Sequence, residues 1–376
     1  MTTSQKSKLL GTMRKTAVAL GLAFTMLTVW GRDVWAQASP PSVTWTLPNT
    51  PQAQAFLALT GMNQQQLNDF LTGKLEQLFQ TTDAAGFLRR FGDAQSFTSK
   101  GMGVDYASEA TYFEVGGSAS FALGMDRTYQ PGNTQGFPIQ GVGLNASLMA
   151  GVSLSSLGVP VMIFGSWMNV PTSNYGSMSG SLNNWGVHGQ VRLFGPPRST
   201  SALGMLVRWG GIAITTGLDY SHMSLGLRKD VSSNFTFPND TGLNVAMTGA
   251  ASGSGRFNVD MITKSIPLDI TTSVRLMTLL TVYGGMGFDW QLGGGSSMDL
   301  NLDANLVGHS SASPDAYDLG TANVTANVKA DPSAAKIRGI LGLQLNLALL
   351  RIFTQLNFAN TNPMMASLAV GARVAY

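Results

Sequence analysis

MASLAVGARVAY, the last twelve residues of the chain (365–376), alternates apolar residues with small or polar ones. The even-numbered side of this stretch carries Ala366, Leu368, Val370, Ala372, Val374 and Tyr376. The other side carries Ser367, Gly371 and Arg373 among its residues. A period of two predicts a β-strand with one apolar face and one mixed face. The stretch also places an aromatic side chain, Tyr376, at its final position.

The first residues have the pattern of an export signal. Lys6, Lys8, Arg14 and Lys15 precede an apolar run from 16 to 30, and small residues follow at 34, 36 and 38. The run is too short to cross a bilayer, so we interpret residues 1–38 as a cleaved signal peptide. The chain has no cysteine, which excludes disulfides and attachment of lipid to a cysteine.

The aromatic-ended strand and the signal together resemble bacterial outer-membrane β-barrel proteins. The resemblance implies export through the inner membrane, insertion into the bacterial outer membrane, and Tyr376 as the membrane-insertion signal. It also implies two partners, namely outer-membrane lipid and the barrel-insertion machinery.

Composition supports this interpretation. Charged residues make up 11% of the chain, and there are 44 glycines. Loss of the signal removes five positive charges and one negative charge, which takes the formal charge from +3 to −1. A nucleic-acid partner is therefore not expected. Apolar residues alternate with polar ones instead of forming a run of about 18, as a helical span would need. A soluble β-sandwich would carry more charge on its outward faces.

Two regions are expected after the signal. Residues 39–111 form an N-terminal flexible or helical segment, with a flexible lead over 39–60. A helix capped by Asn63 follows, and a shorter helical turn starts near Asp83. This segment lies in the periplasm, plugs the barrel, or binds the lipid surface. Residues 112–376 form the transmembrane barrel.

The fold class is all-β, a closed antiparallel transmembrane β-barrel of about twelve strands, with fourteen as the alternative. The expected strands are 113–123, 142–152, 159–169, 184–193, 204–228, 266–276, 280–292, 298–306, 319–330, 336–347, 350–359 and 365–376. Short turns at 155–158, 277–279 and 348–350 are expected in the periplasm, and longer loops at 126–138, 171–180 and 231–261 outside. The stretch 308–318 departs from this trend, as a long periplasmic turn.

Charged and polar residues on the inward faces are the candidate lumen-lining residues. They are Glu114, His188, Arg192, Asp219, Asp269, Arg275, Asp289, Asp299, Asp303, Arg338, Arg351 and Arg373. One interpretation is an internal network of ion pairs that makes the barrel rigid. The other is a polar pathway that selects solutes, with Asp299 and Asp303 opposite Arg338 and Arg351.

Enzymatic chemistry is not expected. The three histidines, His188, His222 and His309, show no catalytic or metal-ligand spacing, so neither a cofactor nor a metal is predicted. The glycines at 293–295 precede no Lys-Ser/Thr on a helix, so they indicate a flexible turn and not a phosphate loop.

The leading functional hypothesis is a channel or transporter for a small solute, hydrophobic solutes included. Its architecture is similar to outer-membrane fatty-acid transporters, which have an N-terminal hatch. The alternative is a non-conducting structural barrel that presents surface loops or a periplasmic helix to protein partners.

Overall fold

The computed structural model describes residues 37–38, 42–80, 84–100, 112–125, 140–157, 159, 161–194, 206–237, 247–277, 279–311, 313–359 and 364–376. Residues 1–35 and 36–376 form separate units, and the described residues belong to the second. Almost all of the predicted signal peptide therefore lies outside the described residues.

The N-terminal part of the second unit contains two short strands and three helices. They are β1 (Gln37–Ala38), β2 (Ser42–Trp45), α2 (Pro51–Thr60), α3 (Gln64–Gln80) and α4 (Ala84–Thr98). The flexible lead expected over 39–60 is wrong, because Thr50 caps α2 by accepting a hydrogen bond from Ala53 N–H. The cap predicted at Asn63 is confirmed, since Asn63 and Gln66 each accept from the other's backbone N–H at 2.8 Å.

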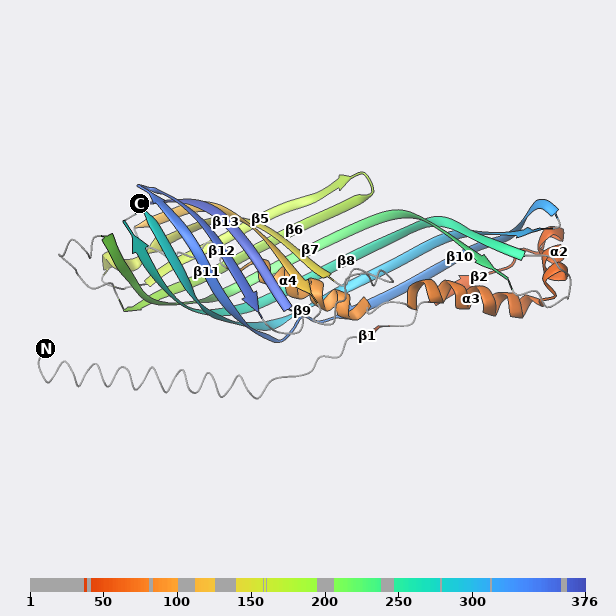
Figure 1. Cartoon of the computed structure of the whole chain (residues 1–376), viewed down its shortest axis with the longest axis horizontal. Coiled ribbons are helices and arrows are strands. Elements are labelled where there is room, and N and C mark those ends of the chain that lie inside the picture. Colours follow the sequence, from red (N-terminus) through yellow and green to blue (C-terminus); the bar gives the residue numbers. More distant parts are fainter. Residues whose placement is uncertain are drawn as a thin grey trace, which may run out of the picture. The chain divides into compact units, whose positions relative to one another are not determined.

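The remaining chain is almost entirely β-structure. Its elements are β3 (Phe113–Met125), β4 (Gln140–Ser153), the 3-10 turn η1 (Leu154–Leu157), β5 (Val161–Tyr175), β6 (Met178–Phe194), β7 (Val207–Thr236), β8 (Met247–Leu276), β9 (Leu280–Ser310), β10 (Ser313–Ala330), β11 (Ala335–Leu347), β12 (Leu350–Ala359) and β13 (Met364–Ala375). Their pairings are antiparallel, and all thirteen strands belong to one sheet (Figure 1).

Part of this sheet closes into a barrel. Among the described residues the ring runs β9, β11, β12, β13, β3, β4, β5, β6, β7, β8 and back to β9. The predicted all-β closed antiparallel barrel is therefore confirmed. The ring has ten members and not the expected twelve. Segments 280–292 and 298–306 are one strand, β9, and β10 lies outside the ring.

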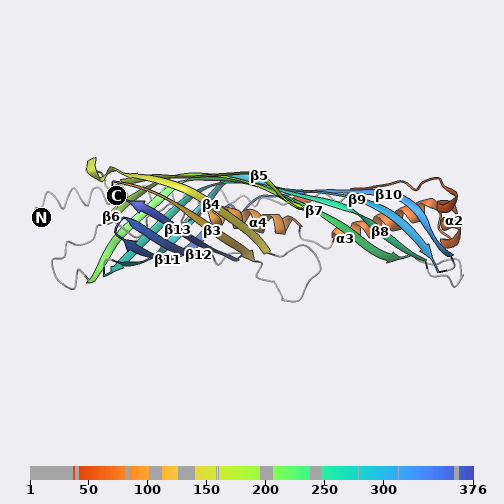
Figure 2. The same ribbon diagram turned by 90° about the horizontal axis from the view of Figure 1, so that it is seen from above.

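Three strands of the ring continue far beyond it. β7 and β8 have 30 residues each and β9 has 31, so each extends roughly 100 Å at about 3.3 Å per residue. The outer half of β9 pairs with β10, whose free edge pairs with β2 and β1. We call this part the sheet extension: β7 from Met223, β8 up to Met261, β9 from Ser296, and β10 with β2 and β1 (Figure 2).

Two predicted loops are replaced by strands in the sheet extension. The expected loop 231–261 is mostly β7 and β8, which pair as far as Thr236 and Thr248. The expected long turn 308–318 is the tip of the β9–β10 hairpin. The glycines at 293–295 make no turn. Gly293 and Gly294 have φ values of 142° and 130°, and β9 continues through them with a one-residue bulge opposite Lys264–Ser265.

The inner face of the sheet changes from polar to apolar where the extension begins. On β8, the same face carries buried Thr263, Ser265 and Asp269 within the barrel but buried Val259 and Met261 beyond it. β7 and β9 change at the same level, since Met261 pairs with Met223 and Ser296. A barrel in lipid is polar inside and apolar outside, whereas a sheet in water is the reverse. The strands therefore leave the membrane at this level.

Aromatic side chains bracket the barrel below this level. Trp167, Trp185 and Tyr220 follow one another across β5, β6 and β7 just below the change. Trp209 lies eleven positions before Tyr220 on β7, about 36 Å along the strand. At a tilt of about 45° this gives a height near 25 Å, the apolar band of an outer-membrane barrel.

Candidate functional site

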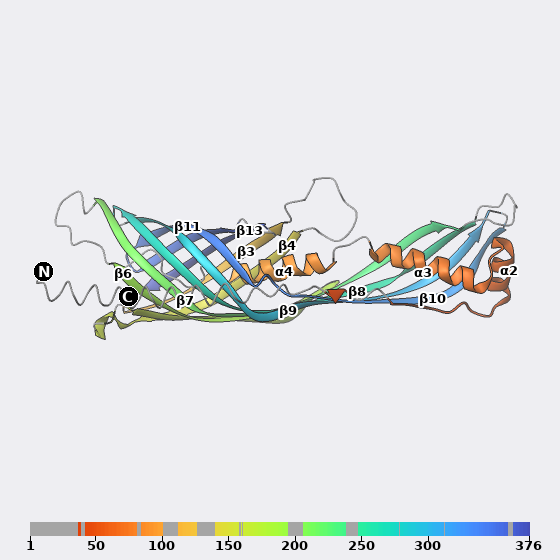
Figure 3. The same cartoon turned by 90° about the horizontal axis from the view of Figure 1, so that it is seen from below.

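Helix α4 occupies the barrel lumen. It contacts β3, β4 and β13 on one side of the ring and β8 and β9 on another, and it also contacts β10 next to the ring (Figure 3). The inner face of β4 is shaped to receive it. A Cβ on Gly141 would lie 2.2 Å from the Arg90 carbonyl, and one on Gly143 would lie 2.5 Å from the Ala94 carbonyl oxygen. Because these are backbone atoms that cannot move aside, the two glycines permit the close approach of helix and strand.

Buried polar contacts also hold α4 in place. Lys336 Nζ of β11 lies 2.8 Å from the Asp93 carboxylate and donates to Ser96 Oγ at 3.0 Å. The other donors to Asp93 are the backbone N–H and hydroxyl of Ser333, each at 2.7 Å. Gln95 donates to Ser221 of β7 and accepts from the Leu144 N–H of β4. Both walls of the lumen are therefore bonded to the helix.

A chain of ionic contacts crosses the lumen just beyond the end of α4. Lys100 Nζ lies 2.8 Å from Asp219 and 3.6 Å from Asp289. Asp219 also lies 3.1 Å from His188 Nε2. Asp289 is bonded in turn to Arg338, at 3.0 Å. These charges have partners from different strands, as buried charges require.

Arg338 forms the far end of this chain. Its guanidinium also donates to Asp269 at 2.5 Å and to Asn357 at 2.9 Å. These partners lie on β9, β8 and β12, so Arg338 of β11 joins four members of the ring and fixes their positions relative to one another. A second buried arginine, Arg373, lies 3.5 Å from Glu114 and donates to Gln344 at 2.7 Å.

The structure places the predicted lumen residues in three groups. Eight are buried in the lumen: Glu114, His188, Asp219, Asp269, Asp289, Arg338, Arg351 and Arg373. Arg192 and Arg275 are half-buried near the barrel end that contains Tyr376. Asp299 and Asp303 are exposed on the outer face of the extension, so placing them opposite Arg338 and Arg351 was wrong.

The reason for that error is the bulge in β9. It moves the even-numbered residues of β9 from the outer to the inner face, and the odd-numbered aspartates move outward. There they accept hydrogen bonds from asparagines of β10: Asn327 donates to Asp299, and Asn323 donates to Asp303 at 2.7 Å. The alternation was identified correctly, but the face was not.

Helices α2 and α3 cover the apolar inner face of the extension. Phe56 of α2 is fully buried, and its ring lies 5.0 Å from Phe237 and 5.6 Å from Tyr317. Phe70 of α3 packs against Phe237 at 5.1 Å. Leu302, Ala304, Leu306, Ala322 and Val324 complete this core from β9 and β10. The N-terminal segment thus provides the apolar cover that the extension needs in water.

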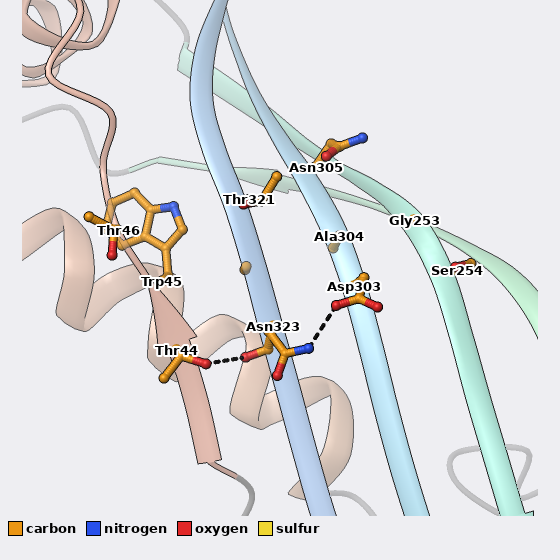
Figure 4. Close-up of a pocket in the computed structure, with 11 residues that line it drawn as sticks. Thr44, Trp45, Thr46, Gly253, Ser254, Asp303, Ala304, Asn305, Thr321 and Asn323 are labelled. Atoms are coloured by element: carbon orange, nitrogen blue, oxygen red, sulfur yellow. Dashed lines mark hydrogen bonds between the residues drawn. The ribbon is translucent and has the colours of Figure 1, made fainter.

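The outer face of the extension is polar and contains a groove, which we call the extension groove. It has a volume of about 590 Å³. It is lined by Thr44, Trp45, Thr46, Gly253, Ser254, Asp303, Ala304, Asn305, Thr321, Ala322 and Asn323 (Figure 4). These residues come from β2 and the residue that follows it, and from β8, β9 and β10. No sequence pattern indicates this groove, because its residues converge only when β2 pairs with β10.

Metal binding and membrane crossing by a helix both lack support among the described residues. No group of three or more His, Cys, Asp or Glu side chains there is arranged to hold a metal ion. No helix among the described residues is both long enough and apolar enough to cross a bilayer.

A family model described as Lsa36-like matches residues 52–376. The chain belongs to the Lsa36-like family. No curated protein matches the sequence. The matched residues include α2 except Pro51, the whole of α3 and α4, and the barrel strands.

Several solved structures are similar. One is Ail, the attachment invasion locus protein of Yersinia pestis, with 7% identity over 71% of this chain and 99% of that chain, at a TM-score of 0.24. The translocator domain of autotransporter NalP from Neisseria meningitidis is 11% identical. The match covers 71% of this chain and 90% of that chain, with a TM-score of 0.27. The Ralstonia pickettii toluene transporter TbuX is 8% identical. The match covers 77% of this chain and 99% of that chain, with a TM-score of 0.24. TM-scores this low carry no functional argument.

This Lsa36-like chain is an outer-membrane β-barrel protein. Its ring of antiparallel strands is closed, and its outer face is apolar between two levels of aromatic residues. A closed ring leaves no unpaired strand edge in lipid, which is the condition for crossing a membrane with strands. The protein therefore resides in the bacterial outer membrane.

Proposed function

We propose that this protein is an occluded outer-membrane barrel that carries a folded sheet away from the membrane and presents its polar face to external partners. The observation that carries the proposal is the change of polarity on β7, β8 and β9. A barrel that served only as a pore would not need strands of 30 residues, more than twice the number that a bilayer requires. The extra length forms a second structure with its own apolar core.

The orientation follows from the connections. The turns at 277–279 and 348–349 lie at the Tyr376 end, where Ala375 N–H donates to the Leu349 carbonyl and Asn346 N–H donates to the Leu279 carbonyl. The extension projects from the opposite end (Figure 1). Outer-membrane barrels have short turns in the periplasm and long connections outside the cell. We therefore assign the extension to the cell surface.

The lumen supports an anchoring role for the barrel. Helix α4 fits a glycine-lined groove, and eight of the predicted lumen residues are buried around it or below it. Ion pairs that join several strands make a barrel rigid and leave few charges available to a passing solute. This arrangement favours the structural alternative over the channel.

The absence of cysteine makes the orientation simple to test. Ser252→Cys places a single thiol on the exposed face of the extension, and Leu349→Cys places one in a turn at the Tyr376 end. A membrane-impermeant maleimide should label intact cells carrying Ser252→Cys. Cells carrying Leu349→Cys should be labelled only after lysis. The reverse pattern would contradict the proposal.

A gated channel is the second candidate function, for a small solute, hydrophobic solutes included. It is favoured by the polar nature of the contacts that hold α4, because water could replace the ion pair of Lys336 and the hydrogen bonds of Gln95. In planar bilayers an occluded anchor stays electrically silent with or without residues 39–95. A channel gated by this segment gains conductance when the segment is deleted.

A further inference from the structure

The extension groove combines fixed and free polar groups. Asn323 Nδ2 donates to both Asn301 Oδ1 at 2.9 Å and Asp303 Oδ1 at 2.7 Å, which holds these side chains in place. By contrast, the side chains of Ser254, Asn305 and Thr321 form no hydrogen bond or ion pair to any residue that the structure describes. Free donors and acceptors therefore converge on one hollow.

The chemistry of these groups selects a class of ligand. Hydroxyl and amide side chains both donate and accept hydrogen bonds, and a carboxylate accepts them. Among the described residues that line the groove there is one carboxylate, Asp303, and no cation, which disfavours an anionic ligand. An apolar ligand would leave the polar groups without partners. A neutral polyhydroxyl compound matches both the donors and the acceptors, because each of its hydroxyls can do the same.

Size and position agree with such a ligand. A volume of about 590 Å³ lies within the range of small-molecule sites and gives room for a short oligosaccharide. Asp303 lies seven positions beyond Ser296 on β9, about 23 Å along the strand from the level where polarity changes. The groove is therefore beyond the lipid headgroups, at a height that a polysaccharide chain can reach.

We propose that the extension groove binds a neutral carbohydrate chain, with Asp303, Asn305 and Thr321 as its hydrogen-bonding residues. The inference deepens the proposed function, since it gives the chemical class of one external partner. The sugar could come from the cell's own lipopolysaccharide or from a glycan outside the cell. The two sources share the same chemistry, and the experiment separates them.

The test uses the full mature chain in a zwitterionic detergent, because detergents with sugar headgroups would compete. The probes are a panel of neutral tri- and tetrasaccharides of glucose, galactose, mannose and N-acetylglucosamine, and separately purified lipopolysaccharide. Binding is measured by saturation-transfer NMR for the free sugars and on a biosensor for the lipopolysaccharide. Asp303→Ala and Thr321→Val should each weaken binding about ten-fold or more.

Asp299→Ala is the matched control. Asp299 is exposed on the same face of β9 and accepts from an asparagine of β10, as Asp303 does, but it does not line the groove. This variant should bind as the unmodified chain does. Binding of free sugars, or of lipopolysaccharide alone, supports the proposal and identifies the source. The proposal is overturned if no probe binds at millimolar concentration, or if Asp299→Ala weakens binding as much as Asp303→Ala.

These outcomes are independent of the surface-labelling test. If thiol labelling shows the extension in the periplasm, sugar binding in detergent is unaffected and only the assignment to the cell surface fails. If labelling succeeds and no sugar binds, the surface role stands and the groove proposal fails.

Discussion

Replacing Lys336 by methionine should release α4 from the lumen. The side chains of Lys336 and Asp93 are 3% and 0% exposed, and Lys336 Nζ lies 2.8 Å from the carboxylate. Removing one partner of a buried pair costs about 3–5 kcal/mol, because the other charge is left buried. Ser333 still donates two hydrogen bonds to Asp93, so we expect the lower end, about 3 kcal/mol. At about 1.36 kcal/mol per decade, the undocked population rises roughly 150-fold.

Limited proteolysis measures this population directly. Arg90 lies within α4 and is 7% exposed, so trypsin can cut after it only when the helix has left the lumen. When undocking is fast relative to cleavage, the cleavage rate follows the undocked fraction. Lys329→Met is the control, because Lys329 is exposed on β10 and its loss should change stability by less than about 0.5 kcal/mol.

A second substitution tests the effect of the Asp93 charge that Lys336→Met leaves buried without its ion-pair partner. In the Lys336→Met background, Asp93→Asn removes the buried charge and should recover part of the protection from trypsin. Equal cleavage of Lys336→Met and Lys329→Met would refute the reasoning, since it would show that this ion pair does not hold the helix.

Three other predictions test separate parts of the structure. Gly141→Ala should destabilise α4 docking by about 1–3 kcal/mol through its clash with helix backbone, whereas Gly189→Ala, with no atom within 4 Å of the new Cβ, should leave trypsin cleavage unchanged. Phe56→Ala should weaken the core of the extension by about 3–5 kcal/mol, so that proteases cut residues 51–80 while the barrel keeps its folded mobility in unheated gels. Tyr376→Ala should slow machinery-assisted insertion into liposomes severalfold and Tyr376→Phe should not; equal rates would contradict its role as an insertion signal.

The barrel strands were predictable because each obeys a single rule. In β13, alternation over 365–376 gave the strand, and its pairing with β12 and β3 follows from neighbouring positions in the ring. The same is true of β3, β4, β11 and β12. For these strands one face meets lipid and the other meets the lumen along their whole length, so a period of two is enough to place every side chain.

The sheet extension was not predicted because alternation does not show which face of a strand contacts water and which contacts lipid or a protein core. In β9, apolar residues stay at even positions from Leu280 to Leu306, yet the bulge transfers them from the lipid face to the covered face. In β8 no residue is inserted, and the apolar positions change instead, from odd at Val259 and Met261 to even at Ile266 and Leu268. That change within one strand was the available signal. It was overlooked because the region before it was interpreted as a loop.

The helical segment was predicted in part. The capping residue Asn63 and the spacing of apolar residues after it were sufficient to identify α3. Its position was not, because burial on the extension depends on partners more than 200 residues away, such as Leu302 and Val324. For the lumen, the sequence supplied the buried charges but not their pairs, which the closing of the ring determines.

The pairing of β10 with β2 and β1 has a consequence for assembly on a crowded cell surface. A long free margin of sheet is a template on which further chains can add, and neighbouring copies in a membrane are always close at hand. Here Ser42–Trp45 of the same chain pair with Ala322–Thr325 in the middle of that margin. Each molecule thus covers part of its own sheet edge, which leaves a shorter stretch on which a neighbouring copy could add a strand.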